Sequence, residues 1–143
     1  MSADSTGYSD KPVWQKLGIK TGMRVRVLDA PGDYAALVGT DDATFALVGA
    51  RTALDLAHVF ATSATVLARN IDALANVLPA DGILWVSWPK KASKVPTDIS
   101  EDTVRAIALP LGLVDVKVCA IDAVWSGLKL VWRREMRAGK PRA

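Results

Sequence analysis

The chain has 143 residues, 50% of them hydrophobic, which suits one domain with a single core. Its single cysteine excludes an internal disulfide framework. Because the chain has only one histidine and one cysteine, a transition-metal site of the usual imidazole or thiolate type is not expected. The formal net charge is +3, but residues 129–143 contain six basic residues and one acidic residue. The basic character therefore belongs to the C-terminal end, and we do not expect nucleic acid as a partner.

The two ends of the chain differ from its middle. Residues 1–10 are small and polar and are expected to form a disordered tail, and residues 135–143 a basic, solvated tail. The sequence has no basic segment followed by an apolar leader, and no apolar run approaches the roughly 18 residues of a membrane helix. We therefore expect one domain over residues 11–134 in a cytoplasmic protein without membrane contact. The sequence sets no oligomeric state.

The first strand is predicted at residues 24–28, RVRVL, and it runs into the polar loop 29–33. Apolar residues within 34–38 are spaced as one face of a short helix, which Gly39 closes. The sequence thus begins with a strand, a tight turn and a helix.

The region 44–61 contains two strand-like segments, TFALVGA and LDLAHVFA. They follow each other too closely for a parallel crossover, which needs a dozen or more residues. The two segments form a hairpin, or the first is a short edge segment, and both alternatives stay open.

A second helix is predicted after Ser63, a suitable N-cap. Its apolar face consists of Leu67, Ile71, Leu74 and Leu78. The strand that follows, at residues 83–88, is an apolar run without polar alternation, which is typical of a parallel strand covered on both faces. Pro89 has no amide hydrogen to donate, so the sheet ladder should end there.

The last third of the chain predicts a helix and a strand pair. Asp98 and Glu101 have the spacing of a capping box at the start of the helix. Residues 113–122 alternate as a half-buried strand. One face would hold Val114, Val116, Val118 and Ala120, and the other Asp115 and Lys117. Residues 125–127 are predicted as a turn before a final strand, which completes an antiparallel hairpin at the sheet edge.

These elements predict an α/β fold, a single Rossmann-like three-layer domain with a mostly parallel sheet and a C-terminal antiparallel β-hairpin. In such sheets, ligands bind outside the carboxyl ends of the strands. The candidate ligand-binding residues at that edge are Asp29, Trp88, Lys90, Lys91, Lys94, Asp122, Trp125 and Ser126. The three lysines would attract a phosphate or carboxylate, or would keep a solvated loop soluble.

Three side chains, Asp29, Trp125 and His58, have competing interpretations, and Cys119 has one. Asp29 would bind a hydroxyl or cap the following helix, and Trp125 would stack on a flat ligand or cover the core. His58 lies in a predicted strand and would be a buried structural residue or a catalytic base. Cys119 lies in mid-strand and is expected to be a packed, unreactive thiol.

The order of a helix, LPADG, an apolar strand, a helix ending in GL and a terminal strand pair resembles the second half of class I S-adenosylmethionine-dependent methyltransferases. That resemblance implies a cofactor held by the first half, with a glycine-rich loop after the first strand and an acidic residue after the second. Here loop 29–33 has no G-x-G, and the second strand ends in Gly49, Ala50 and Arg51. The resemblance therefore extends to the fold and not to the cofactor site.

Longer segments resemble a family of short bacterial proteins classed as a domain of unknown function. They include KPVWQKLGIKTGMRVRVLDAPGDYAALVG, LDLAHVFATS and ILWVSWPKKASKVPTDISEDTVRAIALPLGLVDVKVCAIDAVWSGLKLVWRR. The similarity covers roughly residues 8–134. It implies the fold and a bacterial cytosolic setting, and it brings no activity, substrate or catalytic residue.

The sequence contains neither a G-x-x-x-x-G-K-S/T phosphate loop nor a G-x-S-x-G nucleophile elbow. The leading hypothesis is therefore a non-catalytic module that binds an anionic small molecule or a protein partner through Asp29, Lys90, Lys91 and Trp125. No catalytic residue and no cofactor are expected under it. The alternative is a reduced methyltransferase that uses S-adenosylmethionine in an atypical pocket.

Overall fold

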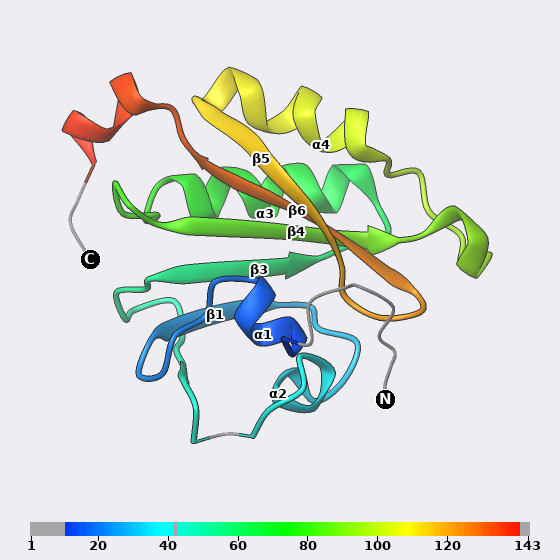
Figure 1. The fold of residues 1–143 in the computed structure, drawn as a ribbon. Coiled ribbons are helices and arrows are strands. Elements are labelled where there is room, and N and C mark those ends of the chain that lie inside the picture. Colours follow the sequence, from blue (N-terminus) through cyan, green and yellow to red (C-terminus); the bar gives the residue numbers. More distant parts are fainter. Residues whose placement is uncertain (1–10, 42, 141–143) are drawn as a thin grey trace.

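The computed structural model describes residues 11–41 and 43–140, and its centre is a six-stranded sheet in the order β2-β1-β3-β4-β6-β5 (Figure 1). The strands are β1 Arg24–Leu28, β2 Ala46–Leu47, β3 Leu56–Phe60, β4 Ile83–Pro89, β5 Leu113–Ala120 and β6 Trp125–Trp132. Strands β1 to β4 are parallel, and β6 is antiparallel to both β4 and β5. The predicted α/β fold with its C-terminal hairpin is confirmed. The predicted tail at residues 1–10 lies outside the described residues.

Helices cover both faces of the sheet, which gives the predicted three layers. Helices α3 Ala64–Ala75 and α4 Glu101–Ala108 lie on one face, and α1 Val13–Lys16 and α2 Tyr34–Leu37 lie on the other (Figure 1). Each face has its own apolar core cluster. No helix in the described part of the chain is long and apolar enough to cross a membrane.

Helix α3 has the predicted apolar face, since Leu67, Ile71 and Leu74 are buried. Its N-cap is Ser63, whose hydroxyl oxygen accepts a hydrogen bond from the amide of Val66 at 3.4 Å. This segment therefore follows from its 3.6-residue periodicity and its cap.

The predicted capping box of Asp98 and Glu101 is wrong. Helix α4 starts later, because Ser100 and Thr103 form the reciprocal side-chain and backbone hydrogen bonds of the box. Asp98 instead accepts a hydrogen bond from the amide of Ala64 at 2.7 Å. It therefore satisfies a free amide at the start of α3, on the neighbouring helix.

Strand β2 settles the region 44–61. It is two residues long, lies at the sheet edge and pairs in parallel with β1. Strand β3 pairs with the other side of β1 and with β4. The edge-segment alternative is therefore confirmed, and the hairpin alternative is wrong.

Strand β5 contains a bulge that the regular alternation did not predict. The pairing with β6 shifts between Asp115 and Lys117, so Val116 is an extra residue without a partner. Asp115 faces α4 and accepts a hydrogen bond from Arg105, whereas the Lys117 ammonium donates to the carbonyl of Lys16 near α1. The two side chains predicted on one face therefore lie on opposite faces.

The same bulge explains the burial along β5. Val116 and Val118, predicted to face inward, are 57% and 50% exposed, while Cys119 is buried. One extra residue exchanges the two faces of a strand, because side chains alternate with a period of two.

The predicted turn at 125–127 is also wrong. Residues 125–127 belong to β6, and the connection from β5 lies at residues 121–124. There the Asp122 carboxylate accepts hydrogen bonds from the amides of Val124 at 2.8 Å and Trp125 at 2.7 Å. An aspartate that binds the backbone two and three residues ahead makes this turn, and Gly127 is a strand residue opposite Cys119.

The C-terminal end is more ordered than expected from its composition. Residues Arg134–Gly139 form a short 3-10 helix, η3, and Met136 packs against the first core cluster. The Lys140 ammonium lies 3.9 Å from the centre of the Trp132 ring. Glu135, Arg137, Ala138 and Gly139 are nevertheless exposed, so the helix is surface-lying and touches the body through Met136 and Lys140. Residues 141–143 are outside the described part.

Candidate functional site

The carboxyl ends of β1, β3 and β4 meet at one edge of the sheet because these strands are parallel. Strand β6 runs the other way, so Trp125 at its start lies at the same edge, opposite Pro89. Three hollows open along this edge, and we name them the lysine, aspartate and loop hollows. Each of the eight candidate residues lines at least one of the three.

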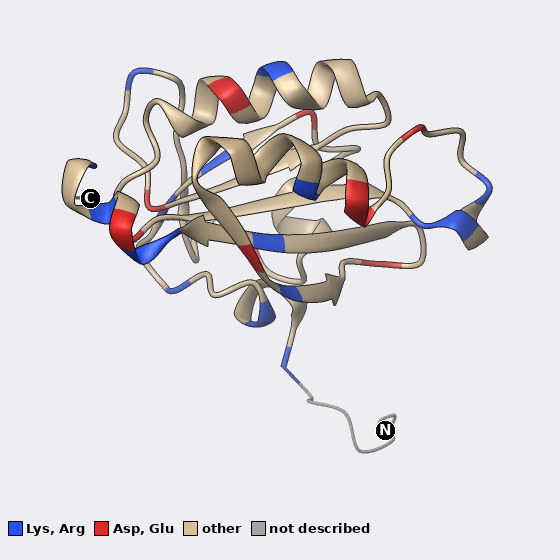
Figure 2. Cartoon of the chain, turned by 90° about the horizontal axis from the view of Figure 1, so that it is seen from above, with Lys and Arg blue, Asp and Glu red and all other residues tan. Residues whose placement is uncertain are grey.

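The lysine hollow lies beyond the end of β4 and has a volume of about 520 Å³. Its cationic residues are Lys90, Lys91 and Lys94, and its apolar residues are Trp88, Pro89, Val95, Pro96 and Ile99. Figure 2 shows basic residues along the segment that follows β4, at one end of the molecule. The volume falls in the range of small-molecule pockets, about 300–1,000 Å³.

The three lysines of this hollow differ in their contacts. The Lys90 ammonium donates a hydrogen bond to the carbonyl oxygen of Asp122 at 2.7 Å. Within residues 11–41 and 43–140, the ammonium groups of Lys91 and Lys94 make no hydrogen bond or ion pair. Lys91 and Lys94 are therefore the cations available to a ligand.

One carboxylate also lines the lysine hollow. Glu101 is paired with Arg105, whose Nη2 lies 2.6 Å from a carboxylate oxygen of Glu101. This pairing reduces the repulsion that Glu101 would exert on an anion, so the hollow keeps an excess of positive charge.

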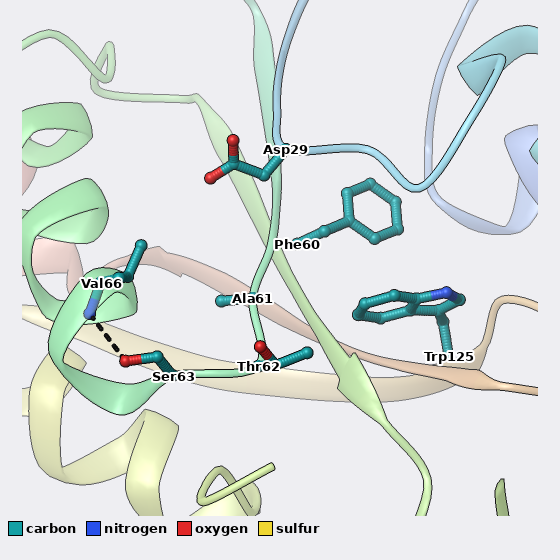
Figure 3. Close-up of a pocket in the computed structure, with 7 residues that line it drawn as sticks. All are labelled: Asp29, Phe60, Ala61, Thr62, Ser63, Val66 and Trp125. Atoms are coloured by element: carbon teal, nitrogen blue, oxygen red, sulfur yellow. Dashed lines mark hydrogen bonds between the residues drawn. The ribbon is translucent and has the colours of Figure 1, made fainter. Parts of the chain in front are cut away.

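The aspartate hollow has a volume of about 250 Å³ and lies between the ends of β1 and β3 and the start of α3 (Figure 3). Its lining residues are Asp29, Phe60, Ala61, Thr62, Ser63, Val66 and Trp125. Figure 3 shows the six-membered ring of the Trp125 indole directed toward Ala61 and Thr62, with the indole nitrogen on the far side. The Phe60 ring meets this indole edge-on, with 5.3 Å between centroids.

Asp29 does not cap the helix that follows it. The N-cap of α2 is Asp33, whose carboxylate accepts from the amide of Ala36 at 3.4 Å. Asp29 is exposed, and its carboxylate accepts a long hydrogen bond of 3.4 Å from the Asn70 side chain. The predicted capping role is therefore wrong, and the carboxylate is open to the hollow.

Trp125 forms a wall shared by two hollows. The loop hollow, of about 410 Å³, lies on its other side and is lined by Pro31, Gly32, Asp33, Ala36, Leu37, Asp122 and Trp125. Trp125 also packs against the second core cluster. Its indole N–H makes no hydrogen bond among the described residues and remains a free donor. The predicted packing of Trp125 on the core is therefore confirmed, and its stacking on a flat ligand stays a prediction.

Sequence analysis missed Thr62, Ser63 and Thr97 as lining residues. Thr62 and Ser63 come directly after β3, and Thr97 donates its hydroxyl to the Thr62 carbonyl at 2.8 Å. The carboxyl end of β3 is the signal that could have found the first two. For Ser63 the sequence pattern predicts only the helix cap, and this prediction is confirmed.

His58 is a buried structural residue. Its Nδ1 lies 2.7 Å from the Tyr34 hydroxyl and its Nε2 lies 2.7 Å from the Ser87 hydroxyl. Burial lowers the pKa of His58 to about 3 and raises the pKa of Tyr34 far above its usual value. A neutral imidazole with both nitrogens occupied and no exposed surface cannot serve as a base for a ligand at the edge.

Cys119 is buried as expected. Burial raises the pKa of its thiol, although Lys16 and Lys117 lie near enough to oppose the shift. The thiol lies on the α1 side of β5, away from the three hollows. A protonated, enclosed thiol is a poor nucleophile, in agreement with the expected packed and unreactive residue.

The methyltransferase resemblance implies a glycine-rich loop after β1 and an acidic residue after β2 to hold S-adenosylmethionine. Gly32 is the one glycine of the loop after β1, and a Cβ built on it would meet no atom within 4 Å. The segment after β2 presents Gly49, Ala50 and Arg51, with no carboxylate for ribose hydroxyls. These residues do not fit the cofactor in that arrangement.

Comparison with solved structures identifies the fold. The chain is similar to a SAM-dependent methyltransferase from Aquifex aeolicus, with TM-score 0.60, 14% identity, and coverage of 82% of this chain and 86% of that chain. It is also similar to magnesium protoporphyrin IX methyltransferase from Synechocystis PCC 6803 with bound SAH. There the TM-score is 0.53, the identity 12%, and the coverage 83% of this chain and 77% of that chain.

A third similar structure is the ribosomal protein L11 methylase from Lactobacillus delbrueckii subsp. bulgaricus. Its TM-score is 0.53, its identity 14%, and the coverage 84% of this chain and 74% of that chain. No protein-family model and no curated protein matches the sequence. At these identities the similarity shows the fold alone, and the chain has a reduced, methyltransferase-like Rossmann fold.

Proposed function

We propose that this protein is a small-molecule-binding module built on a methyltransferase fold, and that an anionic ligand occupies the lysine hollow. The observation that carries the proposal is the pair of open ammonium groups, Lys91 and Lys94, at the mouth of a hollow at the carboxyl edge. In open α/β sheets, this edge is where ligands bind.

The lining of the hollow favours an anion attached to an apolar body. Trp88 and Ile99 are buried beneath the hollow and Val95 is 38% exposed at its side, so an apolar group would gain contact area there. A phosphate or carboxylate would then lie near Lys91 and Lys94, whose ammonium groups each offer three N–H donors. A nucleotide, a sugar phosphate and an acyl-CoA represent this class.

Backbone strain gives independent support. Asp29 and Lys94, with φ of 60° and 62°, are the two non-glycine residues with positive φ in the described part of the chain. Both line a hollow at the carboxyl edge. Such conformations cost about 1–3 kcal/mol and gather at functional sites, where surrounding structure holds them in place.

The proposed module does not need a catalytic residue. The single histidine is enclosed by Tyr34 and Ser87, and the single cysteine lies on β5 away from the hollows. A ligand in the lysine hollow would instead meet lysines, hydroxyls, apolar side chains and the carboxylate of Glu101, which is paired with Arg105. This lining offers donors to an anion and no unpaired carboxylate or imidazole as a proton acceptor.

The test is calorimetry and thermal shift with inorganic phosphate, nucleotides, sugar phosphates and acyl-CoA. The Lys91→Ala/Lys94→Ala variant should weaken binding about tenfold, because each lysine supplies a charge-assisted contact that is partly screened by solvent. The matched control is Lys20→Ala/Arg134→Ala, which removes the same charge from exposed residues at the opposite edge. The control should bind as the natural protein does.

Two results would contradict this proposal. The first is the absence of any ligand at millimolar concentration across the set. The second is equal weakening in the lysine-hollow variant and in the control variant, which would reduce the effect to net charge. Binding of a protein partner in place of a small molecule would appear as a lysine-dependent complex without a small-molecule shift.

S-adenosylmethionine is the second candidate ligand, and the fold comparisons favour it over a non-catalytic module. Solved neighbours are SAM-dependent methyltransferases, and one of them is described with bound SAH. In this chain, the aspartate hollow with Asp29 and Trp125 would be the place for such a ligand, in an arrangement different from the one implied by the resemblance. The protein would then be a reduced methyltransferase.

This second candidate has its own experiment. Calorimetry with S-adenosylmethionine and S-adenosylhomocysteine should show binding that Asp29→Asn and Trp125→Ala weaken and that Lys91→Ala/Lys94→Ala leaves unchanged. No heat at millimolar cofactor would remove the candidate.

A further inference from the structure

Lys90 lies between the lysine hollow and the wall that Trp125 forms for the other two hollows. Its side chain lines the lysine hollow, and its ammonium donates to the Asp122 carbonyl at 2.7 Å. Its backbone amide also donates to the Val124 carbonyl at 2.7 Å. One residue at the end of β4 therefore holds the turn 121–124 at two points.

The turn 121–124 holds the backbone of Trp125 by hydrogen bonds. The Asp122 carboxylate accepts the amides of Val124 and Trp125, and the Trp125 carbonyl accepts the amide of Ile121 at 2.9 Å. Pro89, opposite Trp125, has no amide hydrogen to offer. The ladder of β4 and β6 pairs Trp88 with Ser126, and the hydrogen bonds from Lys90 extend this pairing past Pro89 to the turn 121–124.

From these contacts we infer that Lys90 is a positioning residue: it sets the place of Trp125 through the turn 121–124 and is not a ligand of the anion. The assignment of the anion to Lys91 and Lys94 rests on the proposed function. The role of Lys90 toward Trp125 stands on the hydrogen bonds alone and can be measured without any ligand.

We therefore expect different roles for three lysines that are close in sequence: Lys90 holds the turn, and Lys91 and Lys94 bind the anion. Removing the Lys90 ammonium leaves the Asp122 carbonyl without its donor and loosens the turn, so the surroundings of Trp125 change. Removing Lys91 and Lys94 takes away two open cations and leaves the turn intact. Lys90→Arg keeps a donor at this position and should restore the natural environment of Trp125.

The experiment uses full-length protein labelled with 5-fluorotryptophan. The protein has five tryptophans, and each gives one fluorine resonance. Trp125→Phe assigns the resonance of interest. Lys90→Met and Asp122→Ala should both shift or broaden that resonance and leave the Trp132 resonance in place, as evidence that the fold is kept. The matched control is Lys117→Met, because the Lys117 ammonium also donates to a backbone carbonyl, that of Lys16.

The same variants are titrated with inorganic phosphate and with the tightest anion of the set. Lys90→Met should change the affinity by less than about twofold, and Lys91→Met/Lys94→Met should lower it about tenfold. A natural position of the Trp125 resonance in Lys90→Met would overturn the inference. Equal loss of anion affinity in Lys90→Met and in the double variant would overturn it too.

The two proposals fail separately. If no anion binds any of the proteins, the proposed function fails while the fluorine measurement still decides the role of Lys90. If anions bind through Lys91 and Lys94 but the Trp125 resonance stays unchanged in Lys90→Met and Asp122→Ala, only the inference about Lys90 fails.

Discussion

The two faces of the sheet are covered by helices of very different length. On one face, α3 and α4 have 12 and 8 residues and bury apolar side chains almost exclusively. On the other face, α1 and α2 have four residues each, and the core beneath them includes the hydrogen-bonded group of Tyr34, His58 and Ser87. The second face thus relies on polar contacts where the first relies on helical surface.

The short helices leave one face of this reduced fold with little helical cover. One helical turn covers little apolar surface, and short helices gain little from their own backbone hydrogen bonds. The Trp85 indole donates to the Leu17 carbonyl at 2.7 Å, which fastens the segment after α1 directly to the central strand β4. The long-helix face has one bond of the same kind, from the Trp132 indole to the Leu78 carbonyl at 3.1 Å, so the buried group of Tyr34, His58 and Ser87 is what distinguishes the short-helix face.

The largest expected effect on stability comes from shortening one buried leucine to alanine on each face of the sheet. Leu67 in α3 and Leu17 after α1 are both fully buried. Leu67→Ala should cost toward the upper end of about 2–5 kcal/mol in the free energy of unfolding, because α3 is held at both ends and cannot close the cavity. Leu17→Ala should cost toward the lower end, because the short α1 segment can move inward.

Urea unfolding of both variants measures this difference, provided that the dependence on urea concentration stays that of the natural protein. An equal cost on the two faces, or a larger one for Leu17→Ala, would mean that the short-helix face is as rigid as the other.

The next effect is a pH dependence confined to the polar face. In the unfolded chain His58 takes up a proton near pH 6.5, whereas in the folded protein its pKa is lowered to about 3. The unfolded state therefore binds more protons in this window, and the free energy of unfolding should fall as the pH drops below 6.5, by up to about 1.4 kcal/mol per pH unit.

Urea unfolding at pH 7, 6 and 5 measures this slope, and the range stays above the usual pKa of carboxyl groups. His58→Gln should be less stable at pH 7 and should lose most of the slope. A flat profile for the natural protein between pH 7 and 5 would contradict the enclosed neutral imidazole.

The smallest effect belongs to the long-helix face. The carboxylate of Asp98, which precedes α4, accepts a hydrogen bond from the amide of Ala64 at the start of α3. Asp98→Ala should therefore lower the free energy of unfolding by about 1 kcal/mol, as for the loss of a helix cap. Asp81→Ala is the matched control, since Asp81 is exposed in a turn, and it should stay within about 0.5 kcal/mol. Thermal or urea unfolding compares the two, and equal values would deny Asp98 its capping role.

Most of the fold could be predicted from the periodicity of apolar residues and from the residues that begin and end helices and strands. The row of Leu67, Ile71 and Leu74 gave α3, the run at 83–88 gave the central strand, and Pro89 marked its end. These signals are local and depend on geometry that each segment carries by itself. The same signals could not reveal the bulge at Val116, which arises from pairing with β6.

The candidate site was predictable in place but not in detail. All eight candidate residues lie at the carboxyl edge, because parallel strands bring their ends together. Which lysine is open and which is occupied depends on the turn 121–124, which the sequence pattern placed a few residues too late. The role of Asp33 as the cap in place of Asp29 likewise depends on the path of the loop.

The bulge in β5 has a consequence for how the molecule meets its own copies. Strand β5 is an edge strand, and exposed valines on a flat edge would invite another chain to add a strand. The extra residue at Val116 interrupts the ladder and increases the local twist, and the charged Lys117 follows directly. An irregularity that leaves one residue unpaired is therefore expected to hinder the addition of another strand at the open side of the sheet.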